Sequence, residues 1–291
     1  MRLTIGERIF HIFNYLLLTL FSLIIVFPFW YVLVASLTPY SDFIANNGLL
    51  LFTKKISFEY YIFLLGKSQL IYSSYLVTII NTAIGTLMAL ALTTTAAYVL
   101  AEKNLPGRKA ITYYFLITMF FNGGMIPTYI TVKNLGLINT KYVLILIMAF
   151  SVFNTIIMKA FFEGIPDSLK EAAKIDGASD ARILLEIVLP ISKPAIATIS
   201  LFYIVGYWND FFNAMLYVNN PKLAPVQLIL KNIISQASLP PELLEQAGQA
   251  APPSIGIQFA TIIIVALPMM ILYPFVQKYF EKGITLGAVK G

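Results

Sequence analysis

The chain has 291 residues, of which 58% are hydrophobic and only 12% are charged. A soluble domain carries about 25% charged residues, so this composition excludes an ordinary soluble fold. The absence of cysteine excludes disulfides and thiolate metal sites, and the single histidine, His11, argues against a histidine-ligated metal or a Ser-His-Asp triad. We therefore expect no catalytic and no metal-binding residues. The net charge of +6 lies at the ends of apolar runs, without a separate basic cluster, which argues against nucleic-acid binding.

Six apolar stretches predict the membrane spans. Four of them lack Asp, Glu, Lys and Arg over a full span length, and two reach that length only by including a charged residue. A helix needs about 20 apolar residues to cross about 30 Å of hydrocarbon. The runs are too long for barrel strands and lack their alternating pattern. We therefore predict an all-α integral membrane protein with a single transmembrane domain over residues 1–291. Its six transmembrane helices are expected near residues 12–37, 72–100, 110–132, 142–162, 195–218 and 258–280.

The distribution of Lys and Arg predicts the orientation of these spans. Six spans place both termini on the same side of the membrane. The larger share of the 20 Lys and Arg residues falls on that side, including those of the short loop 101–109. Because loops rich in Lys and Arg stay in the cytoplasm, we expect both termini there, in a multi-pass protein of the lipid bilayer. Residues 163–194 then form a cytoplasmic loop, and residues 219–257 form the last outer loop.

Some segments are expected to depart from straight helices. The block 122–127, Asn-Gly-Gly-Met-Ile-Pro, is expected to interrupt or kink the third span. The proline-rich outer loop 219–257 is expected to be irregular, with short helical pieces. Small residues at four-residue spacing in the second span are typical of close packing between helices. These residues are Gly85, Ala89, Thr93 and Ala97.

The cytoplasmic loop contains a short polar, alanine-rich segment in the longest charged interval of the chain. After Pro166, either Asp167 or Ser168 can cap a helix, and Ser168 with Glu171 has the spacing of a capping box. The helix is expected to end near Ile175, because the following Asp-Gly pair supplies a stop at which glycine can take a positive φ. The segment is therefore predicted to form about two helical turns.

Two interpretations of this short helix remain open on the residues alone. Leu169, Ala172 and Ala173 share one face, and the two alanines permit close approach of another surface. The helix either packs on the protein's own cytoplasmic surface or enters a groove on another protein. A second helix is expected to follow, with its cap and apolar stripe at Ser179 or Asp180, Ile183, Leu184, Ile187 and Val188.

The motif Glu171-Ala-Ala-x-x-Asp-Gly-Ala178, followed by Ile187-x-Leu-Pro190, resembles the EAA loop of bacterial ABC-importer permeases. The carboxyl-terminal ending, residues 283–291, is similar to the maltose-type permease with six spans. The block 121–127 resembles a subgroup that handles oligosaccharides derived from alginate or pectin. Other short motifs resemble the sugar-permease branch: Asn81-Thr82, Ala96-Ala-Tyr98, Leu105-Pro-Gly-Arg108, Ile126-Pro127, Ile165-Pro166 and Trp208-Asn-Asp-Phe211.

In importers of this kind, the short helix lies in a cleft of a cytoplasmic ATPase. Closure of the ATPase dimer on ATP then drives the permease between its inward-facing and outward-facing states. The resemblance implies that the short helix couples the chain to such an ATPase. The implied coupling residues are Ser168 at its start, Glu171 as a polar anchor, Ala172 and Ala173 as the close-contact face, and Asp176 and Gly177 as the terminator.

The resemblance also implies the partners and the compartment. A second permease subunit would form a heterodimer with this chain, and two ATPase subunits would bind at the cytoplasmic loop. An extracytoplasmic solute-binding protein would deliver a carbohydrate to the assembly in the bacterial cytoplasmic (inner) membrane. ATP and Mg would bind to the partner ATPase. This chain has no Gly-x-x-x-x-Gly-Lys-[Ser/Thr] loop, so we expect it to bind no cofactor and to catalyse no reaction.

Polar and aromatic residues inside the predicted spans indicate a substrate path. A carboxylate inside a span is costly unless it faces protein or a water-filled cavity. Aromatic rings stack on the C–H face of a sugar, while amides and carboxylates bond its hydroxyls. The alternative is that the same side chains fix the packing between helices. The candidate path residues are Asn81, Tyr203, Tyr207, Asn209, Asp210 and Asn213.

A self-sufficient secondary transporter or channel is the alternative function. That class predicts inverted repeats and several charged residues inside the spans for ion coupling. Only Asp210 lies plainly inside a predicted span, and a docking loop would have no role in such a protein. Co-purification with an ATPase would distinguish the two functions.

Overall fold

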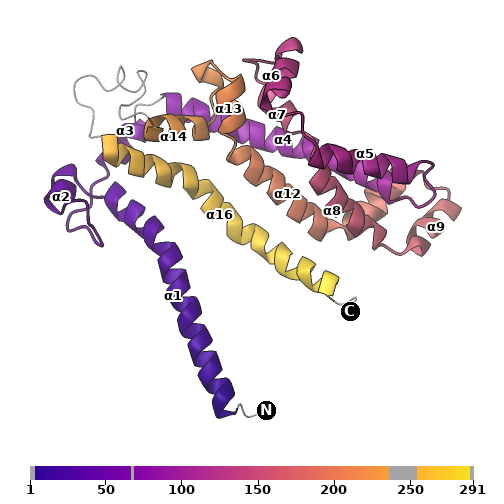
Figure 1. Cartoon of the computed structure of the whole chain (residues 1–291), viewed down its shortest axis with the longest axis horizontal. Helices are drawn as coiled ribbons and strands as arrows, with labels where there is room; N and C mark the ends of the chain where they lie inside the picture. Colours follow the sequence, from indigo (N-terminus) through magenta and orange to yellow (C-terminus); the bar gives the residue numbers. More distant parts are fainter. Residues whose placement is uncertain (1–3, 67–68, 236–253, 289–291) are drawn as a thin grey trace. The chain divides into compact units, whose positions relative to one another are not determined.

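The computed structural model describes residues 4–66, 69–235 and 254–288, and every regular element within these ranges is a helix (Figure 1). The predicted all-helical class is therefore confirmed. The chain divides into two compact units. The first comprises residues 1–71 and 230–267, and the second comprises residues 72–229 and 268–291.

The first unit begins with α1 (Ile5–Ser36), which contains the predicted span 12–37. Thr4 and Glu7 form a capping box, in which the Thr4 hydroxyl accepts from the Glu7 N–H and the Glu7 carboxylate accepts from the Thr4 N–H. The last turn of α1 packs with α2 (Tyr40–Ala45) in a small buried cluster. Val34, Ala35, Phe43 and Leu50 form this cluster, and Tyr31 and Phe259 pack against it.

Aromatic side chains of α3 (Glu59–Gly66) complete the described core of the first unit. The Tyr61 hydroxyl lies 2.6 Å from the hydroxyl of Ser36, at the end of α1. Tyr60 is 1% exposed and its ring lies directly over Gly256 of α16 (Ser254–Ala288). A side chain at Gly256 would overlap that ring, so glycine permits the close approach.

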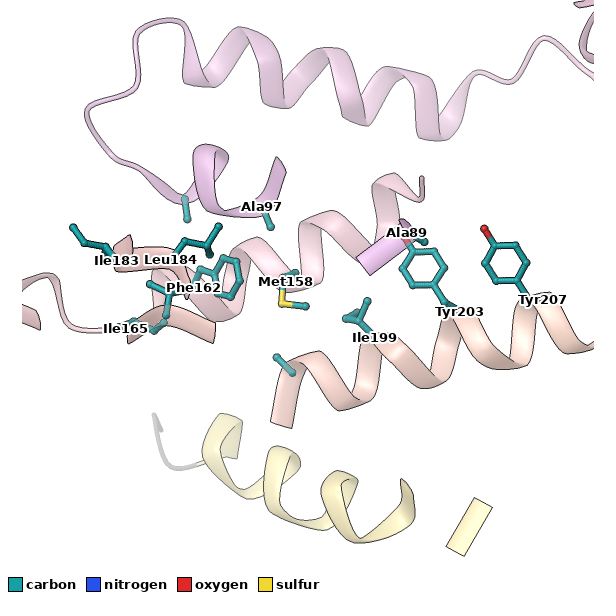
Figure 2. Close-up of a cluster of buried hydrophobic side chains, with 13 residues drawn as sticks. Ala89, Ala97, Met158, Phe162, Ile165, Ile183, Leu184, Ile199, Tyr203 and Tyr207 are labelled. Carbon is teal, nitrogen blue, oxygen red and sulfur yellow. The ribbon is translucent and has the colours of Figure 1, made fainter. Parts of the chain in front are cut away.

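The second unit is built on α4 (Gln69–Ala101), α5 (Arg108–Phe120), α8 (Val152–Glu163) and α12 (Lys193–Trp208). Helix α8 packs against both α5 and α12 (Figure 1). Figure 2 shows the buried cluster of this unit, with Phe162, Ile165 and Leu184 near one end and the two tyrosines of α12 near the other. We call it the main cluster. Its members are Ala89, Ala97, Ala101, Met158, Phe162, Ile165, Ile183, Leu184, Val188, Ala195, Ile199, Tyr203 and Tyr207.

The predicted small-residue stripe of α4 packs against α12. A side chain at Gly85 would overlap the ring of Tyr207. Ala89 and Ala97 are fully buried in the main cluster, and the Thr93 hydroxyl lies 2.7 Å from the Tyr203 hydroxyl. The interpretation of this stripe as a packing surface is confirmed.

Within the described residues, three helices are long and apolar enough to cross a membrane: Ile5–Ser36, Gln69–Ala101 and Ile255–Pro274. The number rises to five if two bent pairs each count as one span. One pair is α5 with α6 (Met125–Asn134), bent by 109° at the predicted 122–127 break. The other is Asp180–Ile191 with Lys193–Trp208, bent by 86°. The predicted count of six spans is therefore not confirmed by the described residues.

Two of the predicted spans are not single continuous helices, because each contains a break. The predicted span 142–162 consists of α7 (Val143–Ile147) and α8, and the Ser151 hydroxyl caps α8 by accepting from the Asn154 N–H at 3.3 Å. The predicted span 195–218 consists of α12 and α13 (Phe212–Tyr217). An apolar run of span length indicates a membrane segment. It does not show whether the helix in that segment is continuous, because a local cap can begin a new helix inside the run.

The outer loop 219–257 contains short helices, as expected. The 3₁₀ turn Pro221–Leu223 and α14 (Val226–Ser235) lie in its described part, while residues 236–253 lie outside the described ranges. The Asn139 side chain ties this region to an earlier turn, because its Oδ1 accepts from the N–H groups of Asn219 and Asn220 at 3.0 and 2.8 Å.

Candidate functional site

The predicted short cytoplasmic helix is α9 (Asp167–Ile175). It ends in a Schellman motif, in which the Gly177 N–H donates to the Lys174 carbonyl at 3.1 Å and the Ala178 N–H donates to the Ala173 carbonyl at 2.9 Å. Gly177 has a φ of +80°, so the predicted glycine stop is confirmed. The end of α9 is therefore determined by residues at the helix end itself rather than by contacts with distant parts of the chain.

The predicted start of α9 needs a correction. Pro166 occupies the N-cap position, and no side chain caps the helix. Ser168 lies one residue inside the helix rather than at its cap, so no Ser168–Glu171 capping box forms. Proline leaves the preceding backbone extended and lacks an N–H of its own, so it ends the earlier segment without a hydroxyl cap. Asp167 in the first turn still compensates the helix dipole.

The two faces of α9 differ in burial. Ala173 is half-buried and, with Ala178, packs against the main cluster. Glu171 and Ala172 are exposed, and Ile175 is 86% exposed. The predicted close-contact face therefore divides: Ala173 faces the protein's own core, whereas Ala172 faces outward. Both interpretations of the helix hold in part, since one side is seated on the chain and the other remains uncovered.

The helix that follows α9 provides most of its seat. The Ser179 hydroxyl caps α10 (Asp180–Ile183) by accepting from the Arg182 N–H at 3.4 Å. A π-helical turn, Leu184–Val188, and α11 (Leu189–Ile191) continue it. The predicted apolar stripe is confirmed by its burial in the main cluster or its packing against that cluster: Ile183, Leu184, Ile187 and Val188.

Ion pairs connect α9 and α8 to the loop between α4 and α5. Lys103 in that loop pairs with Asp167 at 2.7 Å. Glu163, at the end of α8, pairs with Arg108 and, at 3.0 Å, with Lys159. The Arg108 Nε also donates to the Leu100 carbonyl at 2.8 Å. The ends of α4, α5 and α8 are thereby joined into a base on which α9 is held.

The two tyrosines of the predicted substrate path are buried and form hydrogen bonds to other residues of the chain. Tyr203 is 4% exposed, and its hydroxyl contacts the Thr93 hydroxyl and accepts from the Ser151 N–H at 3.2 Å. Tyr207 is 3% exposed and donates to the Ile145 carbonyl at 2.8 Å. These bonds favour the packing interpretation for both residues.

The other candidate path residues of the predicted fifth span, Asn209, Asp210 and Asn213, lie at or just after the break between α12 and α13. Asp210 Oδ1 accepts from both the backbone N–H and the side-chain amide of Asn213, at 3.1 and 3.0 Å. Asp210 Oδ2 is buried and has no hydrogen-bond partner in the described structure. Asn209 is exposed, and its Oδ1 accepts from the Gln227 side chain at 3.0 Å. The structure therefore corrects the expectation that Asp210 lies on one helical stripe with the tyrosines, because Asp210 lies in the break between α12 and α13.

Asn81 is the one predicted path residue that lines a described cavity. The cavity has a volume of about 290 Å³ and lies between α4 and the segments around α7 and α13. Asn81 is 7% exposed, and within the described ranges its side-chain amide forms no hydrogen bond. Thr140, Lys141 and Tyr142 also line the cavity, and sequence reasoning did not single them out.

No cluster of three or more His, Cys, Asp or Glu that could hold a metal ion occurs in the described part of the chain. The sequence matches, over residues 1–286, the family described as binding-protein-dependent transport system inner membrane component. The chain belongs to this family. The resemblance to permeases of bacterial sugar ABC importers is thereby confirmed.

Individual members of the family match along nearly the whole chain. The polygalacturonan/rhamnogalacturonan transport system permease protein YtcP of Bacillus subtilis (strain 168) is 41% identical over 286 residues, covering 98% of this chain and 99% of YtcP. Protein LplC of the same strain is 40% identical over 288 residues, covering 99% of this chain and 97% of LplC.

A solved structure is also similar. The crystal structure of a bacterial ABC transporter involved in the import of the acidic polysaccharide alginate contains a chain that is 32% identical to this one, with a TM-score of 0.87. The match covers 96% of this chain and 99% of that chain. Family membership does not assign roles to individual residues, so the coupling and path residues remain predictions.

We expect substitution of Asp167 by Asn in this permease to have a small, pH-dependent effect. The hydrogen bond and charge of Lys103 hold the pKa of the Asp167 carboxyl below its usual value. Because the pKa is lowered in the folded state, the stabilisation is complete above the unfolded-state value of about 4 and is lost as the pH falls through the lower folded value. The two side chains are 63% and 50% exposed, so solvent screens the pair.

The measurement is the thermal unfolding midpoint of wild type and Asp167→Asn between pH 7 and pH 3. At pH 7 the variant should unfold no more than about 2 °C lower, and the difference should shrink as the pH falls below about 4. A Lys103→Gln variant should behave in the same way. A difference that grows toward low pH would contradict this account.

Proposed function

We propose that this chain is a transmembrane permease subunit of a binding-protein-dependent ABC importer. It moves an oligosaccharide into the cytoplasm using ATP that separate ATPase subunits hydrolyse, and it catalyses no reaction itself. The observation that carries the ATPase coupling is the uncovered face of α9. A short helix held by ion pairs and a Schellman motif, with an exposed isoleucine, has the properties of a helix that enters a groove on a partner.

The assembly contains a second permease subunit in a heterodimer with this chain, two ATPase subunits at the cytoplasmic loop and an extracytoplasmic solute-binding protein. The family description, which names dependence on a binding protein, supports the last of these. ATP and Mg bind to the ATPase subunits. The few long apolar helices support the need for a second permease chain, because they are too few to enclose an oligosaccharide path.

The substrate is a carbohydrate of the oligosaccharide class. YtcP is named for polygalacturonan and rhamnogalacturonan, and the structural neighbour belongs to a transporter of alginate. The bacterial cytoplasmic membrane is the site of action, with both termini in the cytoplasm.

The natural absence of cysteine gives a direct test of this orientation. Ser168 on α9 and Asn220 in the outer loop are both exposed. In intact cells, a membrane-impermeant maleimide should label Asn220→Cys and should label Ser168→Cys only after the cells are opened. The reverse pattern would place α9 outside and remove its proposed contact with the ATPase.

The function itself is tested by purifying the chain from its native membrane and measuring ATP-dependent uptake after reconstitution with its binding protein. We expect an ATPase and a second permease subunit to co-purify. Carbohydrate uptake should require ATP and the binding protein. Uptake that continues without ATP or any bound ATPase would instead favour a self-sufficient secondary transporter.

A further inference from the structure

The cavity next to Asn81 is lined by polar groups that have no partner within the described protein and could bind a ligand. Asn81 as a whole residue is 7% exposed, and its amide has no hydrogen-bond partner among the described residues, while its polar atoms remain accessible from the cavity. An amide that faces a cavity and has no partner in the protein is free to bond a ligand that enters the cavity. The amide offers one acceptor and two donors, which is the complement of a sugar hydroxyl.

Lys141 adds an unneutralised cation to the same cavity. It forms no ion pair with any acidic residue that the structure describes. Its Nζ lies 5.0 Å from the centroid of the Tyr142 ring, which is itself half-exposed along the cavity wall. This contact orients the ammonium group without neutralising it. The Tyr142 ring also offers a flat surface on which the C–H face of a sugar can stack.

The neighbouring segments strengthen the positive character of this region. Residues 121–142 and 211–229 carry Lys133, Lys141 and Lys222 but no Asp or Glu, and the acidic residue next to them in the chain is Asp210. On the proposed topology these segments face outward, where lysine is disfavoured by the usual distribution of charge in membrane proteins. Of these three lysines only Lys141 lines the cavity, and an anionic substrate gives a reason for its position there.

We propose that this cavity is a subsite for a carboxylated sugar residue, a uronate, of the transported oligosaccharide. Lys141 pairs with the carboxylate, the Asn81 amide bonds ring hydroxyls, and Tyr142 stacks on the ring. The volume of about 290 Å³ lies at the lower end of ligand pockets, so the cavity accommodates a small part of a chain rather than a whole oligosaccharide. This inference rests on the proposed function and adds the charge of its substrate.

A single lysine also indicates which anion is bound. A phosphate dianion is usually held by several donors or by an arginine fork, whereas one ammonium group suits a monoanionic carboxylate. The remaining walls are largely aliphatic, formed by residues such as Ile80, Ile84 and Ile145. Lys141 itself is exposed, so solvent partly screens the one charge pair that can form.

The test uses the complete importer, reconstituted in liposomes with its second permease subunit, ATPase and binding protein. The probes are trigalacturonate, trimannuronate, their methyl esters, maltotriose and a glucose phosphate. The readout is the ratio of uptake efficiency, kcat/KM, for each acid to that for its uncharged ester. We expect Lys141→Gln to lower this ratio about five- to tenfold and Lys141→Arg to restore most of it.

Lys133→Gln and Lys222→Gln are the matched controls, because both remove an outer lysine that does not line the cavity. Neither should change the ratio by more than about twofold. Asn81→Ala should lower the efficiency for acid and ester alike, since its amide bonds hydroxyls that both share. The melting midpoint of each variant shows whether it is folded.

The outcomes separate this inference from the proposed function. If wild type imports only maltotriose, or only the sugar phosphate, the carboxylate subsite is refuted while the importer function stands. An unchanged acid-to-ester ratio in folded Lys141→Gln also refutes it. If wild type imports no carbohydrate at all with ATP and its binding protein, the proposed function fails first.

Discussion

Gly85→Ala should lower the thermal unfolding midpoint of the permease by roughly 2–12 °C. The new methyl group would overlap the Tyr207 ring, which is 3% exposed and cannot swing into solvent. Overpacking of this kind costs about 1–3 kcal/mol. Displacing the ring also breaks the 2.8 Å bond from its hydroxyl to the Ile145 carbonyl, which contributes about 1 kcal/mol. Alanine regains about 1 kcal/mol as a better helix former, so the clash dominates.

Two further variants identify the clash as the cause. Gly6→Ala introduces the same methyl group in α1, where no atom lies within 4 Å, and should leave the midpoint unchanged or raise it slightly. Tyr207→Leu should itself destabilise the protein, but adding Gly85→Ala to it should cost much less than in the wild type. Equal costs of Gly85→Ala in the two backgrounds would show that the Tyr207 ring is not the obstacle.

The close approach at Gly85 also explains why the sequence predicted the packing stripe of α4 but left open whether the tyrosines of α12 pack against it or bind sugar. Four-residue spacing of small residues is a local pattern, so Gly85 and Ala89 could be placed on one face without a structure. The tyrosines opposite them have the same spacing in the sequence whether they bind sugar or pack against glycine. Only the hydrogen bonds of Tyr203 and Tyr207 distinguish the two, and those partners lie far away in the chain.

The short helix α9 was predicted nearly to its ends because its determinants are local. Pro166 and Gly177 act within one or two residues of the boundaries that they set. The division of its two faces was not predictable in the same way. Whether Ala172 or Ala173 is covered depends on the main cluster, which is assembled from α4, α8 and α12.

The sequence contains an indication of each break in the predicted spans, but a search for long uncharged stretches does not detect it. Ser151 and Asp210 each accept from a backbone N–H three residues ahead, which is the pattern of a helix cap. A search for caps inside apolar runs could have found both breaks. The cavity with Lys141 had no such signal, since α4 and the segment before α7 meet there only in the folded chain.

Ile175→Asp should abolish most of the ATP hydrolysis that the binding protein stimulates, lowering it more than tenfold, while leaving the melting midpoint of the isolated permease unchanged. The side chain is 86% exposed, so it contributes almost nothing to the stability of the chain alone. Burying an isoleucine at an interface contributes about 1.5–3 kcal/mol, and a carboxylate in the same groove adds a desolvation cost. Together these exceed the 1.4 kcal/mol that corresponds to one factor of ten.

Controls separate docking by α9 from a general effect of charge on the loop 163–194. Leu185 is also apolar and 63% exposed, but it lies on the helix after α9, so Leu185→Asp should retain most of the stimulated hydrolysis. Ile175→Leu should behave as wild type, because it preserves the buried area. Stimulated hydrolysis that survives Ile175→Asp would remove the outward face of α9 from the coupling interface. Because α9 is held to its seat through Ala173 and through the Asp167–Lys103 ion pair, a partner that binds Ile175 would move the main cluster with it.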